Sequence, residues 1–141
     1  MGLDQYAYVA MQAGDSEKYW QSVEYDDVAD AFVNKTSVAK PREIAYWRKH
    51  PNLHGWMEQL WLEKDTNVDD KSVFNGVELE LTWEDLDQLE RAVNCRMLPE
   101  TKGFFFGEDS DEHYLKQDLE FIKQARAELF CGFKVFYNSS W

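Results

Sequence analysis

The feature that most constrains this 141-residue chain is a change of hydrophobic period between residues 77 and 96. Leu79 and Leu81 alternate with glutamates, which predicts a strand with one buried and one solvated face. From Thr82 onward the apolar residues recur at helical spacing, and Asp85 stands three positions after Thr82, as in a capping box. A strand followed at once by an amphipathic helix indicates a fold that combines helices and sheet.

Helical periodicity appears in two further segments, so we expect about three helices, near residues 52–63, 83–96 and 111–131. Asn52 is the expected N-cap of the first helix, with His54 off its main apolar face. We predict a single α+β domain covering residues 1–141. Its helices pack on a small, mainly antiparallel sheet that includes the N- and C-terminal strands.

Short runs rich in aromatic and β-branched residues predict strands at residues 3–11 and 134–137, the second followed by a tail. Asn75-Gly76 lies between apolar residues and predicts a hairpin turn. Residues 17–33 are ambiguous, because they fit a strand followed by a short helix that Asp26 or Asp27 would start. The glycine-framed Phe104–Phe106 run fits either core or interface.

A formal net charge of −12 argues against direct nucleic-acid binding and against anionic membranes. It leaves open a basic protein partner. Cys95 and Cys131 lack any metal or redox spacing, so we expect reduced, mostly buried thiols. With no signal peptide or membrane span visible, the expected location is the cytoplasm, and the oligomeric state is open.

The acidic character of the chain reverses at residues 46–56. These eleven residues carry three large aromatics, two cations and two of the three histidines. Arginine can grip a phosphate or carboxylate, the aromatic rings can stack on a planar group, and histidine can supply a proton. Pro41 and Pro51 bracket an extended connection expected to bring the first two aromatics to a surface. The ligand-binding candidates are Tyr46, Trp47, Arg48, Lys49, His54 and Trp56. In the alternative, the tryptophans are core anchors and the cations pair with acidic helices.

No catalytic, metal or cofactor site is predicted. Phosphate-binding glycine loops and nucleophile motifs are missing from the sequence. His50 and His54 have the spacing of two ligands on one helix face, but Pro51 lies between them. Carboxylates are so abundant that no single pair indicates acid–base catalysis. These observations favour a non-enzymatic protein.

Four segments together resemble a family of small uncharacterised proteins of tailed bacteriophages and prophages. They are the start MGLDxY, Tyr46–Lys49 followed by His54-x-Trp56, the Leu98–Gly107 run LPETKGFFFG, and the final SSW. The similarity covers both termini and most of the chain from residue 42, whereas residues 12–40 match no pattern. The resemblance implies a phage setting and the host cytoplasm, without an activity. Members are sometimes labelled phosphoglycerate kinase, but that enzyme is much larger and needs a nucleotide-binding loop that this chain lacks.

The leading hypothesis is a phage accessory protein that binds a host protein or a small anionic ligand through the Tyr46–Trp56 stretch. One alternative is a small enzyme or binder of a phosphorylated or nucleotide ligand at the same stretch. Another is an acidic decoy that blocks a nucleic-acid-binding protein through its acidic faces at residues 63–90 and 108–120.

Overall fold

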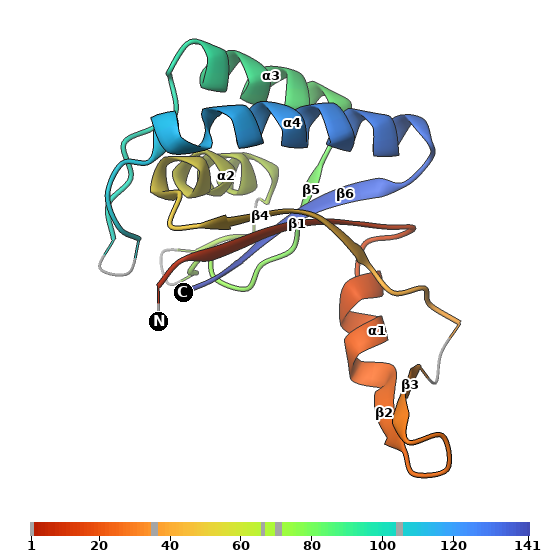
Figure 1. Ribbon diagram of the computed structural model, residues 1–141. Helices are drawn as coiled ribbons and strands as arrows, with labels where there is room; N and C mark the ends of the chain where they lie inside the picture. The colour runs from red at the N-terminus through yellow and green to blue at the C-terminus, as the bar shows by residue number, and fades with distance from the viewer. Residues whose placement is uncertain (1, 35–36, 66, 70–71, 104–105) are drawn as a thin grey trace.

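The computed structural model describes residues 2–34, 37–65, 67–69, 72–103 and 106–141. Within them the chain has the expected α+β fold, with both terminal strands in one small antiparallel sheet. Figure 1 shows helices stacked on one side of this sheet and a separate arm extending from its other side.

The sheet has four strands in the order β4-β1-β6-β5. They are β4 (Arg42–Arg48), β1 (Asp4–Ala10), β6 (Lys134–Ser140) and β5 (Leu79–Leu81). All neighbouring pairs are antiparallel, and Ala7 of β1 lies between Ala45 of β4 and Tyr137 of β6. The first and last strands are therefore the two central strands, which places both chain ends beside each other (Figure 1).

Three helices cover one face of the sheet (Figure 1). They are α2 (Pro51–Lys64), α3 (Trp83–Asn94) and α4 (Asp111–Phe130). Their apolar sides meet the inward residues of the strands in one continuous core. Fully buried members of this core are Ala7, Trp47, Leu53, Met57, Leu86, Leu89, Ile122, Ala125, Val135 and Tyr137. In the described part of the chain, the opposite face of the sheet carries no such layer of helices.

The arm is an insertion between two paired strands. Strands β1 and β4 are antiparallel neighbours with Val9 opposite Arg42, so a short hairpin loop would be enough to join them. Instead the connection contains α1 (Asp15–Ser22), β2 (Val23–Asp26) and β3 (Ala31–Asn34). The last two form their own two-stranded sheet, and the insertion extends away from the helical layer (Figure 1).

The predicted capping box of α3 is confirmed. The Thr82 hydroxyl accepts a hydrogen bond from the Asp85 backbone N–H at 3.2 Å, and the Asp85 carboxylate accepts from the Thr82 N–H at 2.8 Å. Gly132 adopts a φ of 93° just after α4, as expected for a residue that ends a helix.

The predicted N-cap of α2 is wrong, because the N-cap is His50, two residues before Asn52, and the helix begins at Pro51. The Asn52 side chain instead donates to the Asp111 carboxylate at 3.2 Å and accepts from the Thr101 backbone N–H at 3.0 Å. The Asn52 side chain therefore makes tertiary hydrogen bonds and does not cap the helix.

The strand and helix assigned to residues 17–33 are also wrong in position. The helix comes first, as α1, and the apolar residues that suggested a later helix belong partly to strand β3. The Asp26 carboxylate accepts hydrogen bonds from the Val28 and Ala29 N–H groups at 2.9 and 3.3 Å. This bonding closes a turn between two strands instead of starting a helix.

The hairpin predicted at Asn75-Gly76 does not form, because this turn bonds to the end of the chain. The Asn75 amide donates to the Trp141 carbonyl at 2.7 Å and accepts from the Trp141 N–H at 3.1 Å. The Gly76 N–H donates to the Ser139 carbonyl at 2.8 Å. Residues 138–140, expected to belong to a tail, are instead the last part of β6, and Trp141 follows the strand.

Cys95 and Cys131 are exposed, so the expectation of mostly buried thiols is wrong. Each follows the last residue of a helix as its C-cap, and this position lies beyond the buried stripe of the helix. No helix in the described part of the chain is long and apolar enough to cross a membrane.

Candidate functional site

The structure separates the six residues predicted to bind a ligand. Trp47 is completely buried, in contrast to the expectation that its segment brings it to a surface. Its ring packs edge-to-face on Phe121 at 5.1 Å, and its indole N–H donates to the Asp118 carboxylate at 2.9 Å. The alternation of β4 turns Trp47 toward the helices, so it is a core anchor.

A polar cluster surrounds that anchor. His50 Nε2 donates to the other oxygen of the Asp118 carboxylate at 2.8 Å, and both side chains are buried. The Gln5 amide bonds to both backbone groups of His50, at 2.8 and 3.0 Å. The cluster joins β1, β4 and α4 at the start of α2. The remaining ring nitrogen, His50 Nδ1, lies 3.5 Å from the Ser110 hydroxyl. These contacts between buried groups indicate that the cluster holds the fold together.

His54 is buried as well, and its predicted place off the apolar face of the helix is wrong. Its Nδ1 lies 2.7 Å from the Tyr137 hydroxyl, and its ring contacts Phe74, Phe106 and Trp141. Burial lowers the pKa of His54 to about 4, and a hydrogen bond with the Phe74 backbone acts in the opposite direction. The imidazole is therefore neutral near neutral pH and away from solvent. Phe104 and Phe105 lie outside the described residues.

The remaining candidates lie at the surface. The Tyr46 hydroxyl and the Arg48 guanidinium both donate to Asp4, at 2.5 and 2.8 Å. The hydrogen bond from Tyr46 is the larger cause that lowers the pKa of the Asp4 carboxyl, and the bond from Arg48 adds to it. Burial acts in the opposite direction. Lys49 adopts a φ of 57°, and Trp56 packs half-buried against the core. The six residues thus form no common surface, and ligand binding by them stays a prediction.

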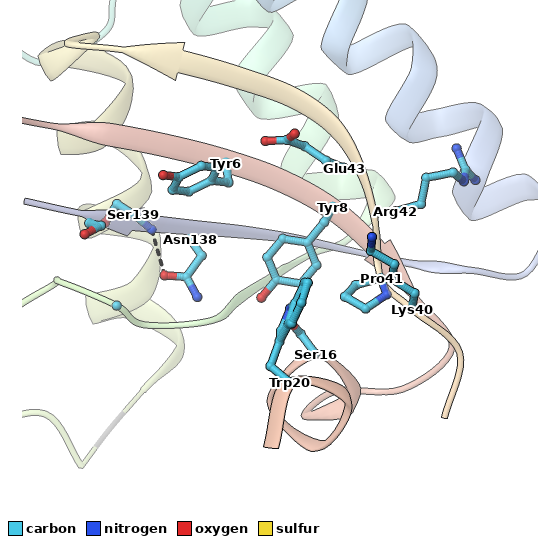
Figure 2. Close-up of a pocket in the computed structure, with 12 residues that line it drawn as sticks. Tyr6, Tyr8, Ser16, Trp20, Lys40, Pro41, Arg42, Glu43, Asn138 and Ser139 are labelled. Atoms are coloured by element: carbon cyan, nitrogen blue, oxygen red, sulfur yellow. Dashed lines mark hydrogen bonds between the residues drawn. The ribbon is translucent and has the colours of Figure 1, made fainter. Parts of the chain in front are cut away.

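A large hollow lies elsewhere, between the uncovered face of the sheet and the base of the insertion (Figure 2). Its volume is about 970 Å³. The sheet contributes residues of β1 and β6, and the insertion contributes α1 and the segment leading into β4. The lining residues are Tyr6, Tyr8, Ser16, Trp20, Lys40, Pro41, Arg42, Glu43, Gly76, Asn138, Ser139 and Ser140.

Two tyrosines at alternate positions of β1 form the floor of the hollow (Figure 2). Tyr8 stacks on Phe136 at 5.7 Å, and its hydroxyl donates to the Glu78 carboxylate at 2.6 Å. Burial, and then this hydrogen bond, raise the pKa of Tyr8. The second oxygen of Glu78 accepts from the Gly14 N–H at 2.8 Å. The carboxylate therefore connects the floor to the start of the insertion.

Trp20 of α1 forms a wall of the hollow, with Lys40 and Pro41 next to it (Figure 2). The Lys40 ammonium lies 5.7 Å from the centroid of the Trp20 ring, within the range of a cation–π contact. Among the described residues no carboxylate lies within ion-pair distance of this ammonium. The Arg42 guanidinium, in contrast, is bound to Glu128 at 2.7 Å and points away from the hollow in Figure 2.

Sequence reasoning missed this hollow. The alternation of Tyr6 and Tyr8 was visible, but it could not show which face of β1 lacks helices. Trp20 fell in the ambiguous segment, and the insertion that follows β1 brings it to the same hollow as the tyrosines. Within the described part of the chain, no three histidine, cysteine or acidic side chains gather closely enough to hold a metal ion.

Comparison with known proteins found no relative: no family model, no curated protein and no solved structure matches this chain. The geometry of the hollow is therefore the basis for the function considered next.

Proposed function

We propose that this protein is a non-enzymatic binding protein whose ligand is a small molecule with a flat ring and one anionic group. A nucleoside monophosphate is the example that we favour. The observation that carries the proposal is the aromatic hollow, with a cation that has no carboxylate partner among the described residues at its wall. Its volume of about 970 Å³ falls within the range typical of small-molecule sites.

The aromatic lining supports a ring-shaped ligand. Tyr6 and the largely buried Tyr8 line the hollow on the sheet side, and Trp20 faces them from the insertion (Figure 2). Trp20 is 57% exposed, so much of its ring is not covered by protein. A flat group held among these rings would remove apolar surface from water and gain the favourable geometry of aromatic contacts.

The charges support a single anionic group. Lys40 supplies one ammonium, and Asn138, Ser16 and the two terminal serines of β6 supply further polar groups to the lining. Glu43 also lines the hollow, and its carboxylate opposes a ligand with several negative charges. The chain as a whole carries −12, so its field repels a ligand with many negative charges. A ligand with one phosphate or carboxylate can pair with Lys40 and is repelled little by the net charge of the chain.

We favour a binding role over catalysis because the described residues that line the hollow include neither histidine nor cysteine. Glu78, the carboxylate that reaches Tyr8, already accepts hydrogen bonds from Tyr8 and Gly14. His54, proposed as an acid or base in the enzyme alternative, is enclosed by aromatic rings in the core. A role in phage infection, in the host cytoplasm, stays a prediction from the resemblance.

A thermal-shift screen with nucleoside monophosphates, the matching nucleosides and benzoate tests the proposal. A ligand at 100 times its dissociation constant should stabilise the protein by about 2.7 kcal/mol. We expect the monophosphate to stabilise most. In Lys40→Gln, the stabilisation by the monophosphate should fall to that given by the nucleoside. In Trp20→Ala, neither compound should stabilise the protein.

Two matched variants serve as controls. Lys123→Gln removes an exposed lysine of α4, and Trp83→Ala removes an exposed tryptophan of α3, each away from the hollow. Neither should change the response. Stabilisation that survives Trp20→Ala but disappears in Arg48→Ala would move the site back to the Tyr46–Trp56 stretch. A ligand series without any response would reject the small-molecule proposal.

A further inference from the structure

The end of the insertion exposes large apolar side chains. We define the hairpin tip as residues 23–34, which contain strands β2 and β3 and the turn between them. Val28 is 98% exposed, Phe32 73% and Tyr25 50%. No residue of the tip is buried. A monomer leaves single apolar residues at its surface as a rule, but three within one short hairpin form a patch that indicates a docking surface.

The hairpin tip has little to hold it when the protein is alone. An isolated two-stranded hairpin is marginally stable in water at best. Its internal contacts include the short β2–β3 ladder, the Tyr25–Phe32 ring pair at 5.5 Å, a hydrogen bond from the Tyr25 hydroxyl to Asp30, and the Asp26 side-chain bonds within the turn. The supporting helix α1 has no buried residue. Cover from a partner would supply the burial that the body of the protein does not.

The charges of the hairpin tip indicate the kind of partner. It contains the acids Glu24, Asp26, Asp27 and Asp30 and neither lysine nor arginine, a net charge of −4. Nucleic acid would be repelled by this charge, and so would a second copy of a chain that carries −12. A basic protein surface is complementary.

We propose that the hairpin tip docks onto a basic protein surface that has an apolar depression for Phe32 and Val28. The apolar side chains would be the central anchors, and the four carboxylates would lie around them as a charged rim. This arrangement follows the anatomy of protein interfaces, in which a desolvated core supplies most of the energy and the rim sets approach and register.

This proposal does not depend on the ligand of the hollow. Trp20 and Lys40, which line the hollow, lie at the base of the insertion, and the hairpin tip is at its far end (Figure 1). Neither Tyr25 nor Phe32 lines the hollow. Failure of small-molecule binding would leave the docking proposal standing, and the reverse also holds.

The experiment uses two synthetic peptides of equal positive charge. One is an amphipathic helix-forming peptide with lysine and arginine on one face and leucine and tryptophan on the other. The second has lysine and glycine only. Binding to the full-length protein is followed by fluorescence anisotropy at low and moderate salt, and the contacted residues are mapped by NMR shifts. We expect the amphipathic peptide to bind more tightly and to shift the signals of residues 23–34.

Variants separate the apolar anchors from the rim. Phe32→Ser should weaken binding of the amphipathic peptide by about tenfold, the loss expected for a central anchor. Val28→Ser should weaken it in the same direction. Because Val28 is almost fully exposed, this change does not disturb the hairpin. The combined change of Glu24→Gln, Asp27→Asn and Asp30→Asn should weaken binding mainly at low salt, because exposed charges are screened.

The matched control neutralises three exposed acids outside the insertion, by Glu63→Gln, Glu108→Gln and Glu120→Gln. It removes the same charge as the tip variant and should leave binding nearly unchanged. An equal effect of the control and tip variants, or equal binding of the two peptides, would show only nonspecific attraction to an acidic protein and would overturn the proposal. Self-association that is lost in Val28→Ser, measured by sedimentation, would overturn it in favour of a second copy.

Discussion

His54 should make the stability of this protein fall as the pH decreases from neutral. Its pKa is about 4 in the folded protein, whereas an unfolded histidine titrates near 6.5. Between these two values the unfolded chain binds a proton that the folded protein excludes. The stabilising contribution is therefore complete above pH 6.5 and is lost as the pH falls through the folded pKa.

The size of the effect follows from the same two values. Each pKa unit corresponds to about 1.4 kcal/mol, so the full loss below pH 4 is about 3 kcal/mol. From roughly pH 7.5 to pH 5 the contribution of His54 is about 2 kcal/mol. For a domain of this size that is a decrease of about 6 °C in Tm.

The test compares the wild-type protein with His54→Asn, because asparagine can keep a polar atom near the Tyr137 hydroxyl without titrating. Urea unfolding is measured by tryptophan fluorescence at both pH values. All other ionisable side chains are common to both proteins, so the difference between the two pH dependences isolates His54. His54→Leu provides a second non-titrating variant. Identical pH dependence in all three proteins would refute the assignment of a buried, neutral imidazole.

Three further changes should have distinct outcomes. Asp118→Ala should lower stability by about 3–5 kcal/mol in urea unfolding, because it leaves the buried N–H groups of Trp47 and His50 without an acceptor; a loss below that of a surface substitution would contradict this. Thr82→Ala should cost about 1 kcal/mol through loss of the capping box, and Thr82→Ser should restore most of it. Replacing residues 12–40 by a short glycine–asparagine turn should preserve the core signals in NMR spectra, because β1 and β4 pair directly. The same change should abolish ligand binding in the hollow, because it removes Trp20 and Lys40. Loss of the dispersed NMR signals would show that the core needs the insertion in order to fold.

The helix α3 shows how far local signals reach. The helix is specified by residues close together in the chain: the capping pair Thr82 and Asp85, and the apolar stripe that includes Leu86. Its hydrophobic period and its N-cap can therefore be predicted without knowledge of any tertiary contact. The terminal strands were recognised for the same reason, from short runs of aromatic and β-branched residues. The three helices expected on the sheet, α2, α3 and α4, are confirmed. The further helix α1 lies in the insertion and was not expected there, because it buries no residue.

The sequence by itself determined the α+β class, the main helices and the acidic charge, because each depends on composition or on neighbours along the chain. Tertiary structure alone decided the candidate site. In a strand, a shift of one residue in register exchanges the two faces, so the pairing of β4 with β1 decides that Trp47 enters the core. The same pairing leaves Tyr6 and Tyr8 on the uncovered face, and the insertion between these strands brings Trp20 opposite them. Contacts between residues far apart in the chain set these positions, and no local pattern records them.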